Sequence, residues 1–514
     1  MKLPLLLVTI AVIYLSQGVG GSKILGVFWT PSKSHHILGS ALLQALAKKG
    51  HNVTLLSPFI DDVDIPNFKQ IKLTGIEDMM RNIANPKTTF IQATLTFFES
   101  IRPLSEKFWQ NQAIQQLISS KEHFDVIISI PVINDSLLGL YHHLGAPVII
   151  FNPSGANSLV NKYVANPTLS SSVNLHTNSG SPETFLGRLH GTSVVVYIGL
   201  MERYVMGPVQ EEIMLRYIPG SPPISELVKN VSLVLANSHL SIEPPRPYVP
   251  NMVQIGGFYA QTTKKLPDNL QKYLDSAKDG AILFSFGTNM KIAEVEKDKL
   301  DAIMEGLRKI APIKVLFKSE IDLKDAPKNV LVSKWLPQND ILAHPNIKAF
   351  ITHGGLGGNT EAVYHGVPMI GIPLFADQKT NIENAVKSGY AVRIFYEDIN
   401  QKTVDEALEQ ILKNPSYTEK AKKRSSLLRK QPMNPMDKAI WWVEHIIEHK
   451  GGEHLRNLGM DLEWYQLYMV DIMLFYLVVI VIMLTTSILS MRWIIRKLFF
   501  KNKNKTKNKK SKKE

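Results

Sequence analysis

Short apolar runs and longer stretches with helical spacing alternate along most of this chain. The run Lys23–Trp29 predicts a strand, Leu38–Lys49 predicts a helix, and Asn52–Leu56 predicts a second strand. The same order recurs in the second half of the chain, at Ala281–Phe286, Lys297–Ile310 and Ile313–Phe317. Continuous apolar strands separated by helices are typical of parallel sheets that are buried on both faces. The pattern therefore predicts an α/β protein with two Rossmann-like halves.

A proline-rich segment between these halves, Glu243–Pro250 (EPPRPYVP), is incompatible with a helix interior or a central strand. We interpret it as the interdomain linker, which gives an N-terminal domain over 22–250 and a C-terminal domain over 251–450. The stretch Thr88–Ile118 is helical and apolar on one side, which fits either a pocket wall or ordinary core packing.

Two hydrophobic runs lie outside these domains. Lys2, the apolar run Leu3–Leu15 and the small residues after it predict a signal peptide over 1–21. The 18 residues Ile472–Leu489 contain no charge and predict a transmembrane helix over 470–490. It follows a juxtamembrane segment, 451–469, and precedes a basic tail, 491–514, which we expect to be cytosolic with the body in the lumen.

The net charge of +13 is concentrated in that tail, because the tail has eleven lysines and arginines between Arg492 and Lys513 and only one acid, Glu514. A terminal run without interleaved aromatic residues does not indicate nucleic-acid binding. Lys510 and Lys512 resemble a retrieval signal for the endoplasmic reticulum, although a chance match is the alternative in so basic a tail. The chain has no cysteine and so no disulfides. Sequons at Asn52, Asn134 and Asn230 are possible glycosylation sites.

A glycine-rich loop follows the predicted strand Ile347–Thr352. It begins with His353 and leads into a helix that we expect to begin near Asn359 and to end at Gly366. Glycines let a backbone approach a bulky anion, and the free N–H groups of a helix N-terminus bind phosphate. We interpret the segment as a pyrophosphate cradle; the alternative is that the glycines only mark tight turns.

Further residues around this loop are suited to a nucleotide sugar. Trp335 can stack on a base, Gln338 can bind the base edge or the ribose, and Glu361 can hold ribose hydroxyls. The whole segment from Trp335 to Gln378 closely resembles the signature of UDP-glycosyltransferases, the family of UDP-glucuronosyltransferases and UDP-glucosyltransferases. The resemblance implies a donor site made of Thr288, Trp335, Gln338, His353, Gly357, Gly358, Glu361, Asp377 and Gln378.

The same resemblance implies the GT-B fold, two facing Rossmann-like domains, here with one C-terminal transmembrane helix. The helical stretch through Trp441, Trp442 and His445 would then pack back on the N-terminal domain. The implied reaction is an inverting transfer of a hexose to a hydroxyl group. His35 takes the position of the general base, and His36 beside it is an inferior alternative.

The resemblance identifies the acid that would orient His35 less directly than it identifies His35 itself. Vertebrate members have an aspartate where this chain has Ile130. Asp135 is our candidate partner for His35; the alternative is that Asp135 only caps the helix that follows it. In relatives an asparagine often replaces Gly357, so a contact there is made by the backbone or is missing.

The resemblance is strongest to insect members, and it implies UDP-glucose as the donor and small lipophilic alcohols or phenols as acceptors. An arginine that helps to bind glucuronate in vertebrate members aligns with Asn237, although Arg246 lies nearby. We expect no metal: Asp61, Asp62 and Asp64 lie far in sequence from the cradle, and Glu361 with His365 lacks a third ligand. A homo- or hetero-oligomer is possible.

Two other functions remain open. One is a membrane-tethered binder of UDP-sugar or lipophiles that has lost catalysis through Ile130 and Gly357. The other is a nucleotide-sugar hydrolase, which would release UDP without an acceptor.

Overall fold

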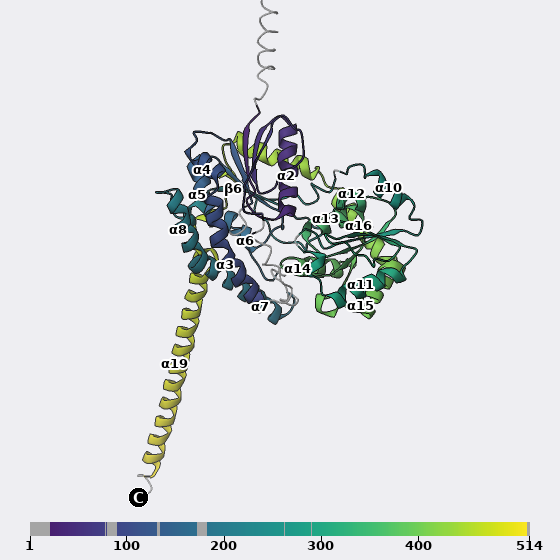
Figure 1. Ribbon diagram of the computed structural model, residues 1–514. Helices are drawn as coiled ribbons and strands as arrows, with labels where there is room; N and C mark the ends of the chain where they lie inside the picture. Colours follow the sequence, from purple (N-terminus) through teal and green to yellow (C-terminus); the bar gives the residue numbers. More distant parts are fainter. Residues whose placement is uncertain are drawn as a thin grey trace, which may run out of the picture. The chain divides into compact units, whose positions relative to one another are not determined.

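Two parallel sheets form the larger of two units in the chain (Figure 1). The computed structural model describes residues 21–77, 79, 90–130, 134–171, 182–261, 263–288 and 290–510. The predicted signal peptide therefore lies outside the described residues, apart from Gly21. By their contacts, the residues up to Arg456 form one unit and those from Asn457 form another.

The first sheet has seven strands in the order β3-β2-β1-β4-β5-β6-β7, all in parallel pairs. Its central strands are apolar and buried on both faces; every residue of β5 and β6 is buried, for example. The strands are β1 (Lys23–Val27), β2 (Asn52–Ser57), β3 (Phe68–Lys72), β4 (Val126–Ser129), β5 (Val148–Asn152), β6 (Val231–Ala236) and β7 (Met252–Gln254).

The second sheet has six parallel strands in the order β10-β9-β8-β11-β12-β13. Strand β11 has the predicted bounds, and β8 and β9 lie within one residue of theirs at each end. The strands are β8 (Ala281–Ser285), β9 (Lys314–Lys318), β10 (Val330–Ser333), β11 (Ile347–Thr352), β12 (Met369–Gly371) and β13 (Ala391–Arg393).

Helices cover both faces of each sheet, so each half has two hydrophobic cores. Those of the first half are α2 (Lys33–Lys48), α3 (Phe90–Trp109), α4 (Gln112–Ser119), α5 (Leu137–Leu144), α6 (Ser158–Asn161), α7 (Phe185–Met201), α8 (Gly207–Tyr217) and α9 (Ile224–Leu227). Those that follow are α10 (Asp268–Asp275), α11 (Lys297–Lys309), α12 (Gln338–Leu342), α13 (Leu356–His365), α14 (Gln378–Lys387), α15 (Gln401–Lys413), α16 (Ser416–Arg429) and α17 (Pro435–Glu448).

The proline-rich segment does not join the two halves, which corrects the boundary predicted near residue 250. It lies between β6 and β7, and both strands belong to the first sheet. The chain reaches the second half only after Gln254, in residues 255–267 before α10. Proline marks an irregular connection because it lacks the N–H that a helix or ladder needs, but it does not reveal which elements that connection joins.

Helix α17 returns to the first half, as predicted. Its residues Ala439, Ile440, Val443 and Ile446 are buried in the core formed by α2 and the first sheet. Glu444 of α17 binds Lys49 Nζ at 2.7 Å and His51 Nε2 at 3.2 Å. The last helix of the larger unit therefore completes the core of the first half.

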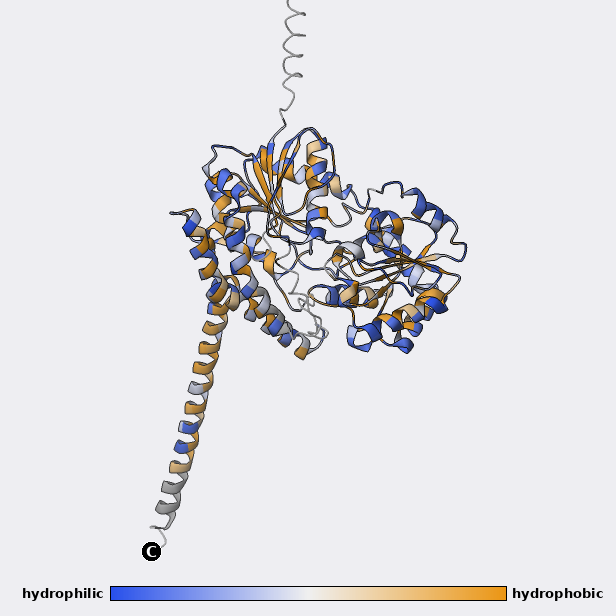
Figure 2. Ribbon diagram, in the orientation of Figure 1, coloured by the Kyte–Doolittle hydropathy of each residue, from blue (hydrophilic) through white to orange (hydrophobic). Residues whose placement is uncertain are grey.

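The second unit contains α18 (Trp464–Leu467) and the long helix α19 (Val470–Lys510). The most apolar 18 residues of its segment Val470–Phe500 have a mean hydropathy of 2.7, and the segment is long and apolar enough to cross a membrane. Figure 2 shows the ribbon of α19 mostly in orange over its apolar part. This helix is consistent with the predicted single-pass anchor.

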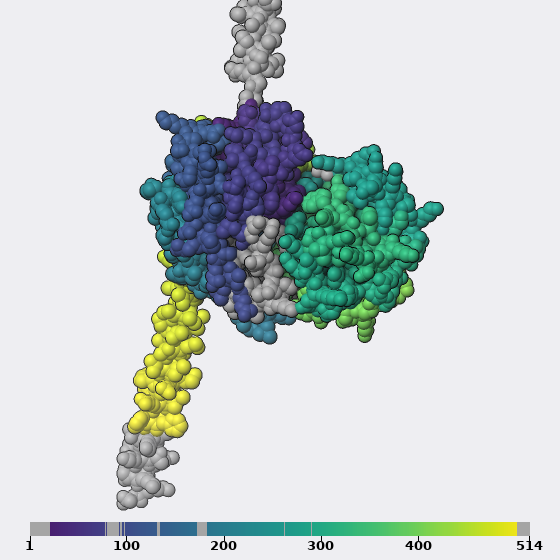
Figure 3. Space-filling view, in the orientation of Figure 1, coloured from purple at the N-terminus to yellow at the C-terminus, as the bar shows by residue number. Residues whose placement is uncertain are grey.

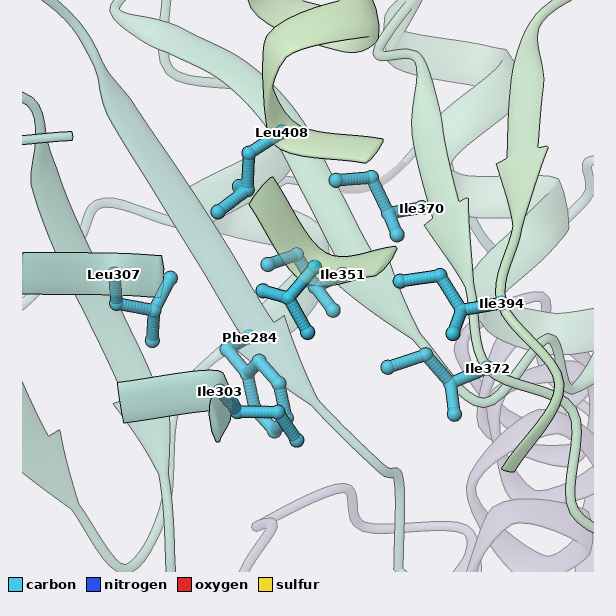
Figure 4. Close-up of a pocket in the computed structure, with 9 residues that line it drawn as sticks. Phe284, Ile303, Leu307, Ile351, Ile370, Ile372, Ile394 and Leu408 are labelled. Atoms are coloured by element: carbon cyan, nitrogen blue, oxygen red, sulfur yellow. The ribbon is translucent and has the colours of Figure 1, made fainter. Parts of the chain in front are cut away.

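Two smaller features follow from burial. Asn134 is fully buried, so its sequon is inaccessible in the folded state, whereas Asn230 is exposed. The pocket in Figure 4 lies between the second sheet and helices α11 and α15, and only apolar side chains line it. It offers no polar group to a ligand and belongs to the core.

Candidate active site

His35 lies in the first turn of α2, directly after the loop that follows β1. The helix begins at Lys33 rather than at Leu38, because Ser32 takes the extended backbone of an N-cap residue. Burial lowers the pKa of His35 to about 4, so its imidazole is neutral at pH 7. Its Nδ1 is buried and has no hydrogen-bond partner among the described residues.

The neighbouring His36 points into the core instead. Its Nδ1 lies 2.8 Å from Ser57 Oγ, and its Nε2 lies 3.1 Å from Asp61 Oδ1. Asp61 also accepts hydrogen bonds from Ser40 and Gln44 of α2. His36 is only 2% exposed, so its role is structural and His35 remains the candidate base.

The expected hydrogen bond between His35 and Asp135 is not formed. Asp135 Oδ2 accepts from Lys162 Nζ at 2.6 Å, and its Oδ1 accepts from the Tyr163 hydroxyl at 2.5 Å. Lys162 also binds Glu202 Oε1 at 3.0 Å, and these two carboxylates raise the pKa of Lys162 despite its burial. The alternative role as a helix cap is not observed either, because Ser136 is the N-cap residue of α5. A partly buried carboxylate beside a lysine forms an ion pair, and no sequence pattern indicates that Lys162 lies beside Asp135.

His353 and Thr288 follow the neighbouring strands β11 and β8, whose last residues Thr352 and Ser285 are paired. Gly287 has φ +77°, and a Cβ there would lie 2.5 Å from His353 Cε1, so the imidazole packs directly against this glycine. Burial and then the charge of Lys318 lower the pKa of His353 to about 4. Its Nδ1 is buried without a hydrogen-bond partner in the described part of the chain.

The first turn of α13 lies against helix α2 of the first half; Figure 1 shows the two helices near each other. The helix begins at Leu356, with Gly355 as its N-cap residue, rather than near Asn359. A Cβ at Gly357 would lie 3.8 Å from Leu38 Cδ1, and one at Gly358 would lie 3.1 Å from Gln338 Nε2. The free N–H groups of this turn therefore lie at the junction of the two halves.

Gln338 and Glu361 are in direct contact, since Gln338 Nε2 donates to Glu361 Oε2 at 2.6 Å. Burial raises the pKa of Glu361 to about 7 in spite of this hydrogen bond. Trp335, three residues before Gln338, is 51% exposed and presents its ring to solvent. An exposed indole, followed three residues later by a half-buried amide that binds a buried carboxylate, is suited to a base with its ribose.

Asp377 and Gln378 lie at the start of α14, after Ala376, whose φ is +53°. Asp377 Oδ2 accepts from Asn381 Nδ2 at 2.8 Å, and burial raises the pKa of Asp377. Gln378 Oε1 accepts from the backbone N–H groups of Leu374 and Phe375. The side-chain oxygen of Gln378 therefore stabilises the loop before α14, and its amide N–H groups are the atoms that would donate to a sugar hydroxyl.

Sequence reasoning missed two lysines at this site. Lys318 Nζ lies 5.0 Å from the centroid of the Trp335 ring and donates to the Gly287 carbonyl at 2.6 Å. Lys33 Nζ, from the other half, lies 4.4 Å from the same ring. Lys318 ends strand β9, so the rule that ligands bind beyond the carboxyl ends of parallel strands could have found it. The sequence contained no comparable signal for Lys33.

The geometry combines a neutral imidazole from the first half with an anion cradle from the second. In Figure 3 the purple N-terminal residues meet the green residues of the second half. No group of three residues suited to hold a metal ion occurs among those that the structure describes. The arrangement fits transfer of a group from a phosphorylated donor to a nucleophile that loses a proton.

Comparison with known proteins agrees with this chemistry. A family model described as "UDP-glucoronosyl and UDP-glucosyl transferase" matches residues 23–506. The chain is 33% identical over 465 residues to UDP-glucosyltransferase 2 of Dactylopius coccus, covering 89% of this chain and 90% of that one. It is 31% identical to UDP-glucuronosyltransferase 2B17 of Mus musculus, over 93% of this chain and 94% of that one.

Solved structures share the fold at low identity. The glycosyltransferase VinC, in complex with DTDP, has a TM-score of 0.56 and 16% identity, over 83% of this chain and 100% of that one. The glycotransferase of kitacinnamycin has a TM-score of 0.57 and 18% identity, over 83% of this chain and 99% of that one. The predicted GT-B architecture of two parallel sheets is confirmed.

Proposed function

Because the chain belongs to the family of UDP-glucuronosyl and UDP-glucosyl transferases, we propose that it transfers glucose from UDP-glucose to small lipophilic alcohols or phenols. One observation carries the proposal. Helix α2, which begins with the turn that holds His35, places Leu38 against Gly357 in the first turn of α13. The helix that carries the candidate base thus contacts the candidate phosphate site.

In the proposed reaction the acceptor oxygen attacks the anomeric carbon while the bond from that carbon to UDP breaks, which inverts the configuration. His35 accepts the proton of the hydroxyl, through Nε2 because Nδ1 is buried. The departing diphosphate is stabilised by the N–H groups of Gly357 and Gly358, by His353, by Thr288 and by the Lys318 ammonium. Trp335, Gln338 and Glu361 hold the uridine, and Asp377 with Gln378 holds the hexose.

The surroundings of Arg246 support a neutral hexose. Its guanidinium donates to the Ala156 carbonyl and lies 3.7 Å from Glu243 Oε1. Asn237, at the position of the glucuronate-binding arginine, donates its amide to the Pro153 carbonyl at 3.1 Å and is buried. A donor carboxylate would therefore meet an arginine that already has an acidic neighbour, whereas glucose needs no counter-ion.

The test uses the purified full-length protein with UDP-glucose, UDP-glucuronate and a panel of phenols, with products identified by mass spectrometry. We expect a glucoside as the main product. Substitution His35→Ala should lower the transfer rate by about 10²- to 10⁴-fold, the contribution of a general base, without changing UDP affinity. Lys48→Gln, at the exposed far end of α2, is the matched control. A His35→Ala variant with full activity would overturn the assignment of the base, and a preference for UDP-glucuronate would overturn the donor.

A non-catalytic binder is the second candidate, because no carboxylate among the described residues binds His35 Nδ1. Such a protein would bind UDP in calorimetry and form no product with any phenol. Release of UDP in the absence of an acceptor would instead indicate a nucleotide-sugar hydrolase.

A further inference from the structure

The exposed ring of Trp335 is in contact with one lysine ammonium group from each half of the protein. Lys33 Nζ lies 4.4 Å from the ring centroid, and Lys318 Nζ lies 5.0 Å from it. Contacts between a cation and an aromatic ring are weak at exposed sites. Two like charges near one ring also repel each other, unless an anion lies close to both. This arrangement is therefore typical of a site that binds an anion.

The two lysines differ in how firmly they are held. Lys318 is half-buried and donates to the Gly287 carbonyl at 2.6 Å, and burial together with the charge of Lys33 lowers its pKa. Lys33 is exposed, and within the described residues it makes no hydrogen bond or ion pair besides its ring contact. A planar base that stacks on Trp335 needs a face of the ring, so Lys33 is the group that can leave.

Lys33 also lies close to the phosphate cradle. It begins α2, and Leu38 of the same helix faces Gly357 at the start of α13. Lys33 precedes Leu38 by five positions, about 7.5 Å along the axis, but lies on another side of the helix. A more direct link is Lys318, which shares the Trp335 ring with Lys33 and donates to the carbonyl of Gly287, the glycine against which His353 packs. His353, with a buried unpaired Nδ1, lies in the same cradle.

We propose that Lys33 is a phosphate-binding residue that the first half supplies to the donor, resting on the proposed function. In the free protein its ammonium covers Trp335. When the uracil stacks on the ring, the ammonium moves to the diphosphate and pairs with its negative charge. Lys33 and His35 share the first turn of α2, so this contact holds the base-bearing turn against the donor. Lys33 is thus a positioning residue, and donor binding prepares the site for the acceptor.

The test compares UDP with uridine, which has the base but no phosphate. Dissociation constants are measured by calorimetry for the full-length wild type, Lys33→Gln, Lys33→Arg and the control Lys48→Gln. We expect Lys33→Gln to weaken UDP binding about tenfold, as for one lost charge-assisted hydrogen bond. Uridine affinity should stay unchanged or rise, because the ring face is no longer occupied. Lys33→Arg should retain most UDP affinity, and the UDP defect should shrink at high salt.

Two results overturn this inference alone. One is an unchanged UDP affinity in Lys33→Gln. The other is an equal loss of affinity for UDP and for uridine, which would mean that Lys33 only supports Trp335. A wild type that binds neither ligand overturns the proposed function and this inference with it. Circular dichroism of each variant shows that the fold is retained, as expected for an exposed lysine.

Discussion

The pH dependence of transfer is a direct test of the environment of His35. An ordinary histidine titrates near pH 6.5, whereas burial lowers the pKa of His35 to about 4. This shift corresponds to about 3 kcal/mol against the imidazolium form. A general base must be neutral, so activity is retained above the pKa and is lost as the pH falls through it. At pH 5.5 an ordinary histidine would keep about a tenth of its activity, whereas His35 should keep nearly all of it.

The assay is kcat/KM for the acceptor at saturating donor, from pH 4 to pH 8, so that the titration of donor binding does not enter. Each sample is returned to pH 7.5 and assayed again, because charging a buried histidine also destabilises the fold as the pH falls. A reversible loss with a midpoint at or above pH 6 would refute the reasoning. It would mean that a carboxylate stabilises the imidazolium during catalysis.

Three further predictions concern the surrounding residues. Asp135→Asn should lower the free energy of unfolding by about 1–3 kcal/mol, because it breaks a partly buried ion pair. It should leave the pH profile of transfer unchanged; thermal unfolding and the same assay check both outcomes. Gly287→Ala should weaken UDP binding at least tenfold, because the added methyl group displaces His353. The control Gly50→Ala, with φ +107° but open space around it, should reduce only stability. Calorimetry that finds the same UDP affinity in Gly287→Ala as in the wild type would contradict this. UDP affinity should rise with pH through about 7 as Glu361 ionises to accept ribose hydroxyls, and Glu361→Gln should remove that dependence.

The cores and the glycine-rich cradle could be predicted from the sequence. Strand β11 has the predicted bounds, since all of its residues except Lys348 are buried and a strand buried on both faces is mostly apolar. Helix boundaries were less accurate: α2 and α13 both begin earlier than predicted, because their N-caps depend on the backbone of Ser32 and Gly355. As a result His35 lies on a helix and not in a loop.

Contacts between distant residues could not be predicted in the same way. Asp135 binds Lys162 rather than His35, and Lys33 lies over Trp335, more than 300 residues away. Both contacts depend on how the elements pack, which hydrophobic patterning leaves undetermined. The prolines of Glu243–Pro250 likewise marked an irregular segment without showing that it connects two strands of one sheet.

The backbone passes between the two sheets twice, first in residues 255–267 and again in the short turn between α16 and α17. The two crossings lie side by side, since Gln431 Nε2 donates to the Gly256 carbonyl at 3.3 Å and Asn434 Nδ2 donates to Gln261 Oε1. They can therefore act together as one hinge between the two halves. Any opening of the cleft would then turn about this one place, where the two crossing segments hold each other. Each closing movement would return His35 to the same place opposite the cradle, whichever acceptor had entered.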